Sequence, residues 1–230
     1  MEKLICPKCH GTRIVRNGKK KYGVQNYLCK DCGHQFIADS DRTYKGTIAW
    51  VVGAILRALV RGCGVRDTAV ILEVSIGKVL KTLLETSYEV KPKKNHYSRL
   101  EVDELWTFVE SKANKKWLIY AYDREGGEIV AYVWGDRSAK TANRLRKKLK
   151  KLGVTYDSIA TDDWESFIKT FNADSHFVGK EHTVGIEGNN CRIRHRMRRV
   201  FRKSCNFSKK LENHFKAFEM TVHYINFGTV

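Results

Sequence analysis

Two CxxC pairs near the amino terminus constrain the fold of this 230-residue chain more than any other feature. Cys6 and Cys9 form the first pair, and Cys29 and Cys32 form the second. Four thiolates satisfy a tetrahedral zinc ion, and this spacing is typical of a structural zinc ribbon. A redox CxxC is expected beside a βαβ pattern, which is absent here, and disulfides are rare in the cytoplasm. Because residues 1–40 contain few large apolar side chains, we expect zinc binding to drive their folding.

Histidines adjoin both cysteine pairs, at His10 and His34. Four cysteines already close a zinc site, so we expect both histidines to be neighbours rather than ligands. Short strands are predicted at 12–16 and 27–29, around a turn at 18–23. The lysines of this turn either contact phosphates or are only solvated, and the sequence leaves both interpretations open.

The charge balance points to a polyanionic partner. Lys and Arg total 43 against 25 Asp and Glu, which gives a net charge of +18. Nucleic acid is the favoured partner. An anionic membrane surface is the rival, but no apolar run reaches the roughly 18 residues of a membrane span. The best candidate, 48–60, is short, carries Arg57 and is typical of a buried helix. The amino terminus also lacks a signal-peptide pattern, so we expect a cytoplasmic protein.

The segment after this helix has the pattern of a helix-turn-helix. Helices are predicted at 65–72 and 76–84, and Ser75 is the expected N-cap of the second. The second helix of such a motif enters the major groove of DNA, so we expect Lys78 and Lys81 to contact bases or phosphates. The alternative is a helical hairpin that packs without reading DNA. The neighbouring zinc ribbon and the basic composition favour DNA binding.

The rest of the chain has the pattern of a mixed α/β domain. Three β-rich segments joined by short connections predict antiparallel neighbours. A basic helix capped by Ser138 follows, and the order βββ-α-β-α-β-α is that of a ribonuclease H-like domain. The predicted elements are strands 100–109, 117–122, 128–134, 156–160 and 176–178, and helices 138–151, 165–171 and one starting near Gly185.

Three acidic residues occupy telling positions in this order. Asp103 lies inside the first strand, where aspartate is disfavoured and costly without a partner. Asp162 directly follows the fourth strand, which in such a sheet lies beside the first. The two would converge and require a cation. Glu187 opens the last helix, and three carboxylates suit two Mg²⁺ ions roughly 3.5–4 Å apart. Asp163 remains the alternative to Asp162.

Other acidic residues in the region are interpreted as solvated surface charge. Any one acid taken alone has that explanation, and only the order of the three favours a metal site. The acids expected to be solvated are Glu101, Glu104, Asp157, Asp163 and Glu165.

A cationic helix is predicted after Glu187. Asn190 and Arg194 share its helical face and are expected to hold DNA phosphates. A run of one-signed charge repels itself, so it favours a phosphate-binding surface whose affinity depends on salt. The basic residues of this run are Arg192, Arg194, Arg196, Arg198, Arg199, Arg202 and Lys203.

Over essentially its whole length the sequence resembles transposases of the insertion-sequence-one family. The resemblance implies a DDE catalytic domain in which Asp103, Asp162 and Glu187 form the metal-binding triad, with Arg194 as a basic partner. It also implies a prokaryotic source and recognition of terminal inverted repeats by the amino-terminal modules. The motifs that carry it are 102–106, 161–164, 182–190 and 205–209.

The predicted architecture is therefore multidomain. The predicted domains are a zinc ribbon at 1–40, a helix-turn-helix DNA-binding module at 44–90, a basic linker at 91–97 and a ribonuclease H-like DDE domain with a mixed five-stranded sheet at 98–230.

The resemblance predicts an enzyme that cleaves DNA strands and transfers them. We expect one structural Zn²⁺ and two catalytic Mg²⁺ (or Mn²⁺) ions. The expected partners are double-stranded DNA, as terminal inverted repeats and target, and a second copy at synapsis, in a homodimer or higher oligomer. The alternatives are a non-catalytic repressor of the same element and a ribonuclease H-like nuclease.

Overall fold

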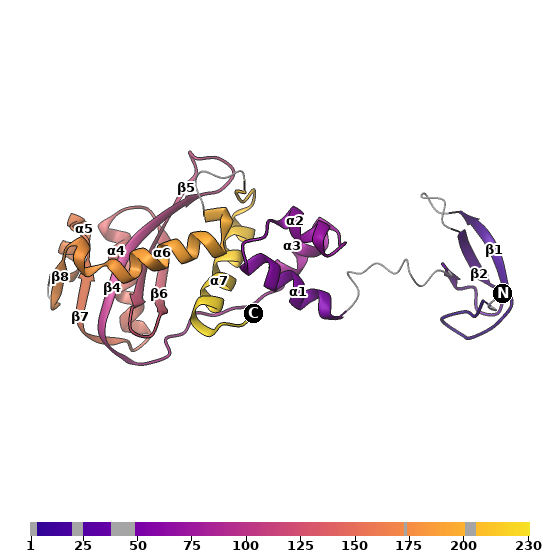
Figure 1. Cartoon of the computed structure of the whole chain (residues 1–230), viewed down its shortest axis with the longest axis horizontal. Helices are drawn as coiled ribbons and strands as arrows, with labels where there is room; N and C mark the ends of the chain where they lie inside the picture. The colour runs from indigo at the N-terminus through magenta and orange to yellow at the C-terminus, as the bar shows by residue number, and fades with distance from the viewer. Residues whose placement is uncertain (1–3, 20–24, 38–48, 173, 201–205) are drawn as a thin grey trace. The chain divides into compact units, whose positions relative to one another are not determined.

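The computed structural model describes residues 4–19, 25–37, 49–172, 174–200 and 206–230. Packing divides the chain into two compact units, Met1–Thr47 and Ile48–Val230. Figure 1 labels helices and strands of both units.

The first unit is built on a small antiparallel sheet. Its strands are β1 (Ile14–Lys19), β2 (Gln25–Cys29) and β3 (Gln35–Phe36), with β2 in the middle. Both predicted strands are present with slightly different bounds, whereas β3 was not predicted because two residues carry no periodic signal. Among the described residues of this unit, the only buried hydrophobic side chains are Cys6 and Cys29. The unit therefore has almost no apolar core of its own.

The second unit contains the predicted mixed five-stranded sheet, in the order β6-β5-β4-β7-β8. Strands β4, β5 and β6 pair antiparallel, as their short connections predict, while β7 pairs parallel with both β4 and β8. The first and fourth strands of the domain are thus neighbours, as expected. The strands are β4 (His96–Phe108), β5 (Lys115–Asp123), β6 (Glu128–Gly135), β7 (Thr155–Thr161) and β8 (His176–Val178).

Helices cover both faces of this sheet (Figure 1). Because side chains alternate along a strand, Val102 of β4 enters one core and Leu105 the other. The core of Val102 is closed by α4 and α5, and the core of Leu105 by α6 and α7. The helices are α4 (Ala139–Lys151), α5 (Glu165–Phe171), α6 (Val184–Arg196) and α7 (Leu211–Phe227).

Three short helices precede the sheet: α1 (Ala49–Val60), α2 (Val65–Ile71) and α3 (Ile76–Leu84). Their bounds agree closely with the prediction, and Ser75 caps α3 by accepting a hydrogen bond from the backbone N–H of Lys78 at 3.0 Å. They bury their apolar side chains in the core that α6 and α7 close. The three helices and the sheet therefore form one compact unit.

The basic segment at 91–97 is packed rather than extended into solvent. The backbone N–H of Lys93 donates to Glu128 at 2.8 Å, and the Tyr97 hydroxyl donates to the same buried carboxylate at 3.2 Å. Strand β4 already begins at His96. This segment is therefore anchored to the sheet that it was expected only to precede.

Within the described residues, no helix combines the length and the apolar character needed to cross a membrane.

Candidate metal centres and nucleic-acid interface

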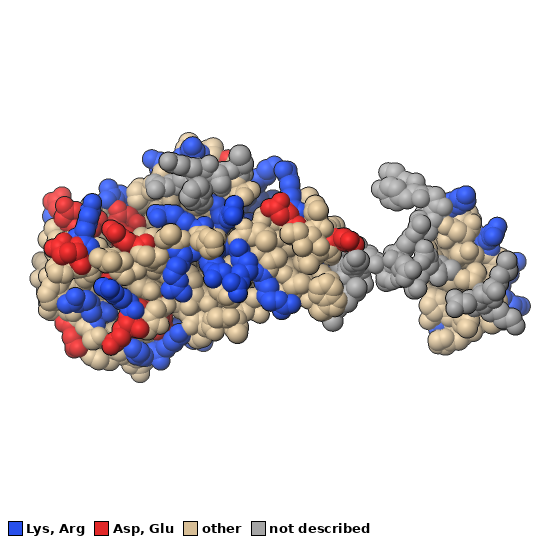
Figure 2. Space-filling view, in the orientation of Figure 1, with Lys and Arg blue, Asp and Glu red and all other residues tan. Residues whose placement is uncertain are grey.

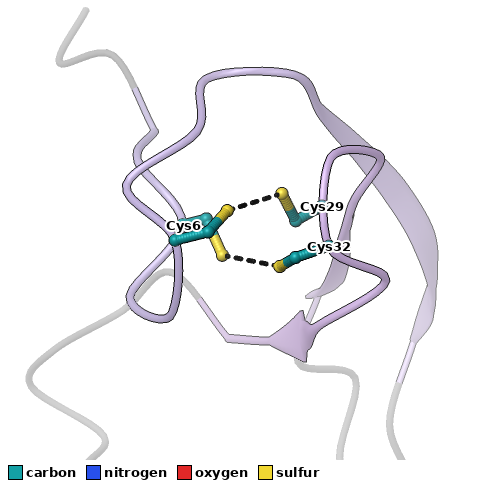
Figure 3. A group of neighbouring side chains, drawn as sticks. Cys6, Cys29 and Cys32 are labelled. Atoms are coloured by element: carbon teal, nitrogen blue, oxygen red, sulfur yellow. Dashed lines mark hydrogen bonds between the residues drawn. The ribbon is translucent and has the colours of Figure 1, made fainter.

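The four predicted cysteines converge in the first unit. The sulfur atoms of Cys6 and Cys32 lie 3.7 Å apart, and those of Cys9 and Cys29 lie 3.6 Å apart (Figure 3). All four lie within 4.8 Å of one another. A tetrahedral zinc ion with Zn–S bonds of about 2.3 Å places its sulfurs about 3.8 Å apart. The cluster therefore fits a closed four-thiolate zinc site.

A tight turn within each CxxC pair produces this arrangement. The backbone N–H of His10 donates to the carbonyl of Cys6, and that of Gly33 donates to the carbonyl of Cys29, both at 2.9 Å. His10 and Gly33 both have positive φ, which is costly for histidine and free for glycine. Neither His10 nor His34 belongs to the metal-binding group, and the His34 ring stacks instead on Phe36.

A second group of potential ligands lies where β4 and β7 run in parallel. The register of the two strands places Val102 opposite Thr161. The next residues along the chain, Asp103 and Asp162, therefore lie just beyond the last paired position. One carboxylate oxygen from each of Asp103, Glu104 and Asp162 lies within 4.8 Å of the others. Oxygen donors of this kind suit Mg²⁺ or Mn²⁺. The predicted convergence of the two aspartates is therefore present in the fold.

Asp103 is held by hydrogen bonds to both carboxylate oxygens. Its Oδ1 accepts from the backbone N–H of Glu104 and its Oδ2 from the amide of Asn190, each at 2.7 Å. Burial, and then the negative charges of Glu104 and Asp162, raise the pKa of Asp103 to about 7. A cation bound among these carboxylates would favour the ionised form.

Asp162 is fixed by the turn that follows β7. Its Oδ1 accepts a hydrogen bond from the backbone N–H of Trp164 at 3.1 Å. The neighbouring Asp163 is exposed and does not belong to the carboxylate group. Asp163 is therefore outside the geometry that joins Asp162 to Asp103.

The interpretation of Glu104 as a solvated residue was wrong. Its side chain is only 8% exposed and forms an ion pair with Arg137 at 2.6 Å. Burial raises its pKa, while the charge and hydrogen bond of Arg137 oppose the rise. A strand covered on both faces leaves its interior residues little access to water. The predicted position of Glu104 inside such a strand was therefore a sequence signal for its burial.

Glu101 was also wrongly interpreted as solvated. It is 2% exposed and accepts a hydrogen bond from the backbone N–H of Ile186 at 2.5 Å. A Cβ at Gly185 would lie 2.8 Å from its Oε1, so the glycine permits the start of α6 to approach β4. Glu101 thus anchors α6 to the sheet. Asp157 and Glu165, also expected to be solvated, are largely exposed.

Glu187 lies in the first turn of α6, where it is exposed. It does not belong to the carboxylate group of Asp103 and Asp162. It precedes Asn190, the residue that donates to Asp103, by one helical turn on the same helix. The structure therefore brings together two of the three predicted catalytic acids and places the third on the helix beside them.

Asn190 does not lie on the surface as its predicted contact with DNA requires. It is 5% exposed, donates to Asp103, and accepts a hydrogen bond from the hydroxyl of Tyr120 at 2.9 Å. Both ends of its amide are therefore engaged inside the protein. Arg194, one turn further along, is half-buried.

The cationic run is shorter as a helix than predicted. Helix α6 ends at Arg196, and a 3-10 turn at Arg198–Val200 follows, because Met197 leaves the helical conformation. Arg196 lies over the Tyr224 ring, and burial lowers the pKa of Arg199, so neither is simply solvated. Arg202 and Lys203 lie outside the described residues.

Basic side chains nevertheless gather on one visible face of the second unit. Figure 2 shows Lys and Arg over the region where α6 lies. Arg192 of α6 and Arg198 of the following 3-10 turn are exposed. On α3, Lys78 is half-buried, and Lys81 is exposed and lies 3.6 Å from Glu85. These cations are candidates for contacts with nucleic-acid phosphates.

The strand order and the two converging aspartates are those expected of a ribonuclease H-like domain, the class of fold that the sequence predicts. A family model described as IS1 transposase matches residues 98–228, and one described as InsA N-terminal domain matches residues 3–33. The chain belongs to the IS1 transposase family and is a transposase of the DDE type.

Several relatives and solved structures are similar to the chain. Insertion element iso-IS1n protein InsB of Shigella dysenteriae is 39% identical over 116 residues, which cover 50% of this chain and 87% of that protein. Insertion element IS1 2 protein InsB of Escherichia coli (strain K12) is 36% identical over 126 residues, which cover 55% and 72%. The catalytic core domain of BIV integrase has a TM-score of 0.41 and 11% identity, with coverage of 57% and 85%.

Proposed function

We propose that the chain binds the terminal inverted repeats of an insertion sequence, cleaves DNA there and joins the cut ends to target DNA. Asp103, Asp162 and Glu187 are the catalytic residues of the proposal. The observation that carries it is the parallel register of β4 and β7, which brings the carboxylates of Asp103 and Asp162 together. Asp162 follows the carboxyl end of β7, the kind of position where α/β sheets collect ligands, and Asp103 lies beside it within β4.

In this proposal Asp103, Asp162 and Glu187 hold two Mg²⁺ or Mn²⁺ ions. Such ions, when bound, activate a water or a 3′-hydroxyl and stabilise the leaving oxygen of an in-line phosphoryl displacement. The residues of the chain position the ligands. Asn190 and the backbone of Glu104 fix Asp103, and the backbone of Trp164 fixes Asp162. In this proposal Asn190 orients a ligand instead of contacting DNA, and Glu187 joins the site from the first turn of α6.

The sulfur cluster of the first unit is assigned one structural Zn²⁺. Its four cysteine donors and their spacing close a tetrahedral site and leave no position for a substrate. We propose that this ion maintains the fold of a ribbon that helps to recognise the element ends.

The proposed DNA-binding elements are the helix-turn-helix of α2 and α3 and the basic surface of α6. Their exposed or half-exposed cations suit phosphate contacts, so the affinity should fall as salt rises. Two element ends must be held together during transposition, and we propose a homodimer or larger assembly, acting at the prokaryotic nucleoid. The proposed DNA contacts are Lys78, Lys81, Arg194, Arg198 and Arg202.

The direct test is a cleavage and strand-transfer assay on the element's own ends in Mg²⁺ or Mn²⁺. Asp162→Asn should lower cleavage by at least about 10³-fold and leave binding of the ends nearly intact, because it removes a ligand and no DNA contact. The matched control is Asp163→Asn, which changes an exposed neighbour and should retain activity.

Three results would contradict the proposal in different ways. Loss of cleavage in Asp163→Asn, with activity kept in Asp162→Asn, would move the ligand by one residue. Wild-type protein that binds the ends and never nicks them would favour a repressor. Cleavage without any product joined to new target DNA would favour a ribonuclease H-like nuclease.

A further inference from the structure

We propose that Glu104 is a further ligand of the divalent ion that Asp103 and Asp162 hold. This inference rests on the proposed function, and it adds a residue outside the predicted triad. One carboxylate oxygen of Glu104 lies within 4.8 Å of an oxygen of each aspartate, which makes it the third member of the group that the fold assembles.

The two oxygens of Glu104 differ in their surroundings. Oε1 accepts a hydrogen bond from Nε of Arg137 at 2.7 Å and forms an ion pair with Nη2 of the same residue at 2.6 Å. Oε2 is buried and has no hydrogen-bond partner among the described residues. An unpartnered buried carboxylate oxygen is costly, and native proteins rarely keep one without a bound ion or water. The arginine therefore accounts for only half of this carboxylate.

Arg137 holds Glu104 in place from a fixed position. Its guanidinium lies over the Trp164 ring, 4.9 Å from the ring centre, and over the Trp117 ring at 5.5 Å. Trp164 is also the residue whose backbone N–H donates to Asp162. The same arginine thus connects Glu104 with the turn that carries Asp162. This is the arrangement expected of a positioning residue that orients a metal ligand.

The charge of Asp103, Glu104 and Asp162 favours a divalent cation among these three residues. One carboxylate oxygen of each of Asp103, Glu104 and Asp162 lies within 4.8 Å of the others, and Arg137 supplies one positive charge to the group. Two negative charges then remain when all three acids are ionised. A single Mg²⁺ or Mn²⁺ neutralises them, and its preference for a few carboxylates plus water or substrate oxygens fits this donor set.

The experiment measures Mn²⁺ binding to the zinc-loaded full chain without DNA, by electron paramagnetic resonance of the free ion. Glu104→Gln keeps the shape and the acceptor for Arg137 but weakens the ligand, and should lower Mn²⁺ affinity by at least about tenfold. Glu165→Gln, on an exposed carboxylate outside the group, is the matched control and should bind as the wild type does.

Glu104→Asp separates ligation from charge, and it also serves if Glu104→Gln does not fold. It keeps the negative charge but withdraws the carboxylate by one methylene, so a ligand role again predicts weaker Mn²⁺ binding. Wild-type affinity in the folded Glu104 variants, with affinity lost in Asp103→Asn and Asp162→Asn, would overturn the inference and leave the proposed function standing. Unchanged affinity in both aspartate variants would overturn the metal site itself.

Discussion

The sulfur cluster and the carboxylate cluster are assembled in different ways. The cysteines come from two short local turns, and their sulfurs already stand 3.6–3.7 Å apart, close to the spacing in tetrahedral zinc. The aspartates come from strands separated in the sequence by β5, β6 and α4, and their oxygens lie within 4.8 Å of one another. The first cluster follows from local spacing, and the second exists only because two distant strands pair.

The surroundings of the two clusters differ as much as their origins. The described part of the first unit buries only two hydrophobic residues, both of them cysteines. The second unit has an apolar core on each face of its sheet. We infer that metal maintains the fold of the first unit, whereas the fold of the second maintains a costly group of like charges until metal binds.

The largest expected effect is therefore the loss of zinc. Chelation, or Cys29→Ser, should unfold the first unit, because structural zinc contributes about 10–16 kcal/mol to folding in comparable small modules. The second unit should keep its secondary structure and its thermal transition. Circular dichroism, limited proteolysis and zinc content of the purified chain check both parts. A first unit that remains protease-resistant without zinc would contradict the inference that metal maintains its fold.

Replacing a carboxylate of the second cluster should stabilise the metal-free protein, whereas the loss of zinc should destabilise the first unit. In metal-free protein, Asp103→Asn should raise the free energy of unfolding at neutral pH by about 1–3 kcal/mol, because it removes a buried charge beside Glu104 and Asp162. Folding raises the pKa of Asp103 from its ordinary value of 3.8 to about 7. Ionisation therefore opposes folding increasingly as the pH rises from about 4 to about 7, and the cost is full above that range.

Denaturant unfolding of the metal-free chain at several pH values checks this sign. The gain from Asp103→Asn should shrink toward zero as the pH falls to about 4, where the wild-type aspartate is protonated in the folded state. Asp163→Asn is the matched control, since its carboxylate is exposed, and it should show little change at any pH. A destabilised Asp103→Asn at neutral pH would mean that the hydrogen bonds to Asp103 outweigh the repulsion.

The same contrast explains which features could be predicted from the sequence. Ligands whose arrangement follows from local spacing, such as Cys6 and Cys9, can be predicted from the sequence alone. Asp103 and Asp162 became a pair through an assumed strand order, and that order is present. The environment of Glu104 and the internal role of Asn190 depend on Arg137, Trp164 and α6, which meet these residues only after the sheet and its helices pack. Sequence periodicity does not contain those contacts.

The smallest expected effect concerns the ion pair beside the cysteine cluster. Arg13 pairs with Asp31 next to the cysteines, but the Arg13 side chain is 74% exposed. Exposed pairs contribute about 0–1 kcal/mol, so Arg13→Ala should leave the stability and zinc retention of the first unit nearly unchanged. Competition with a zinc chelator measures retention directly. Arg137→Ala should lower the stability of the second unit clearly. It leaves Glu104, whose side chain is only 8% exposed, without its only cation partner among the described residues. Equal effects of the two arginine variants would show that the surroundings of the clusters differ less than their burial implies.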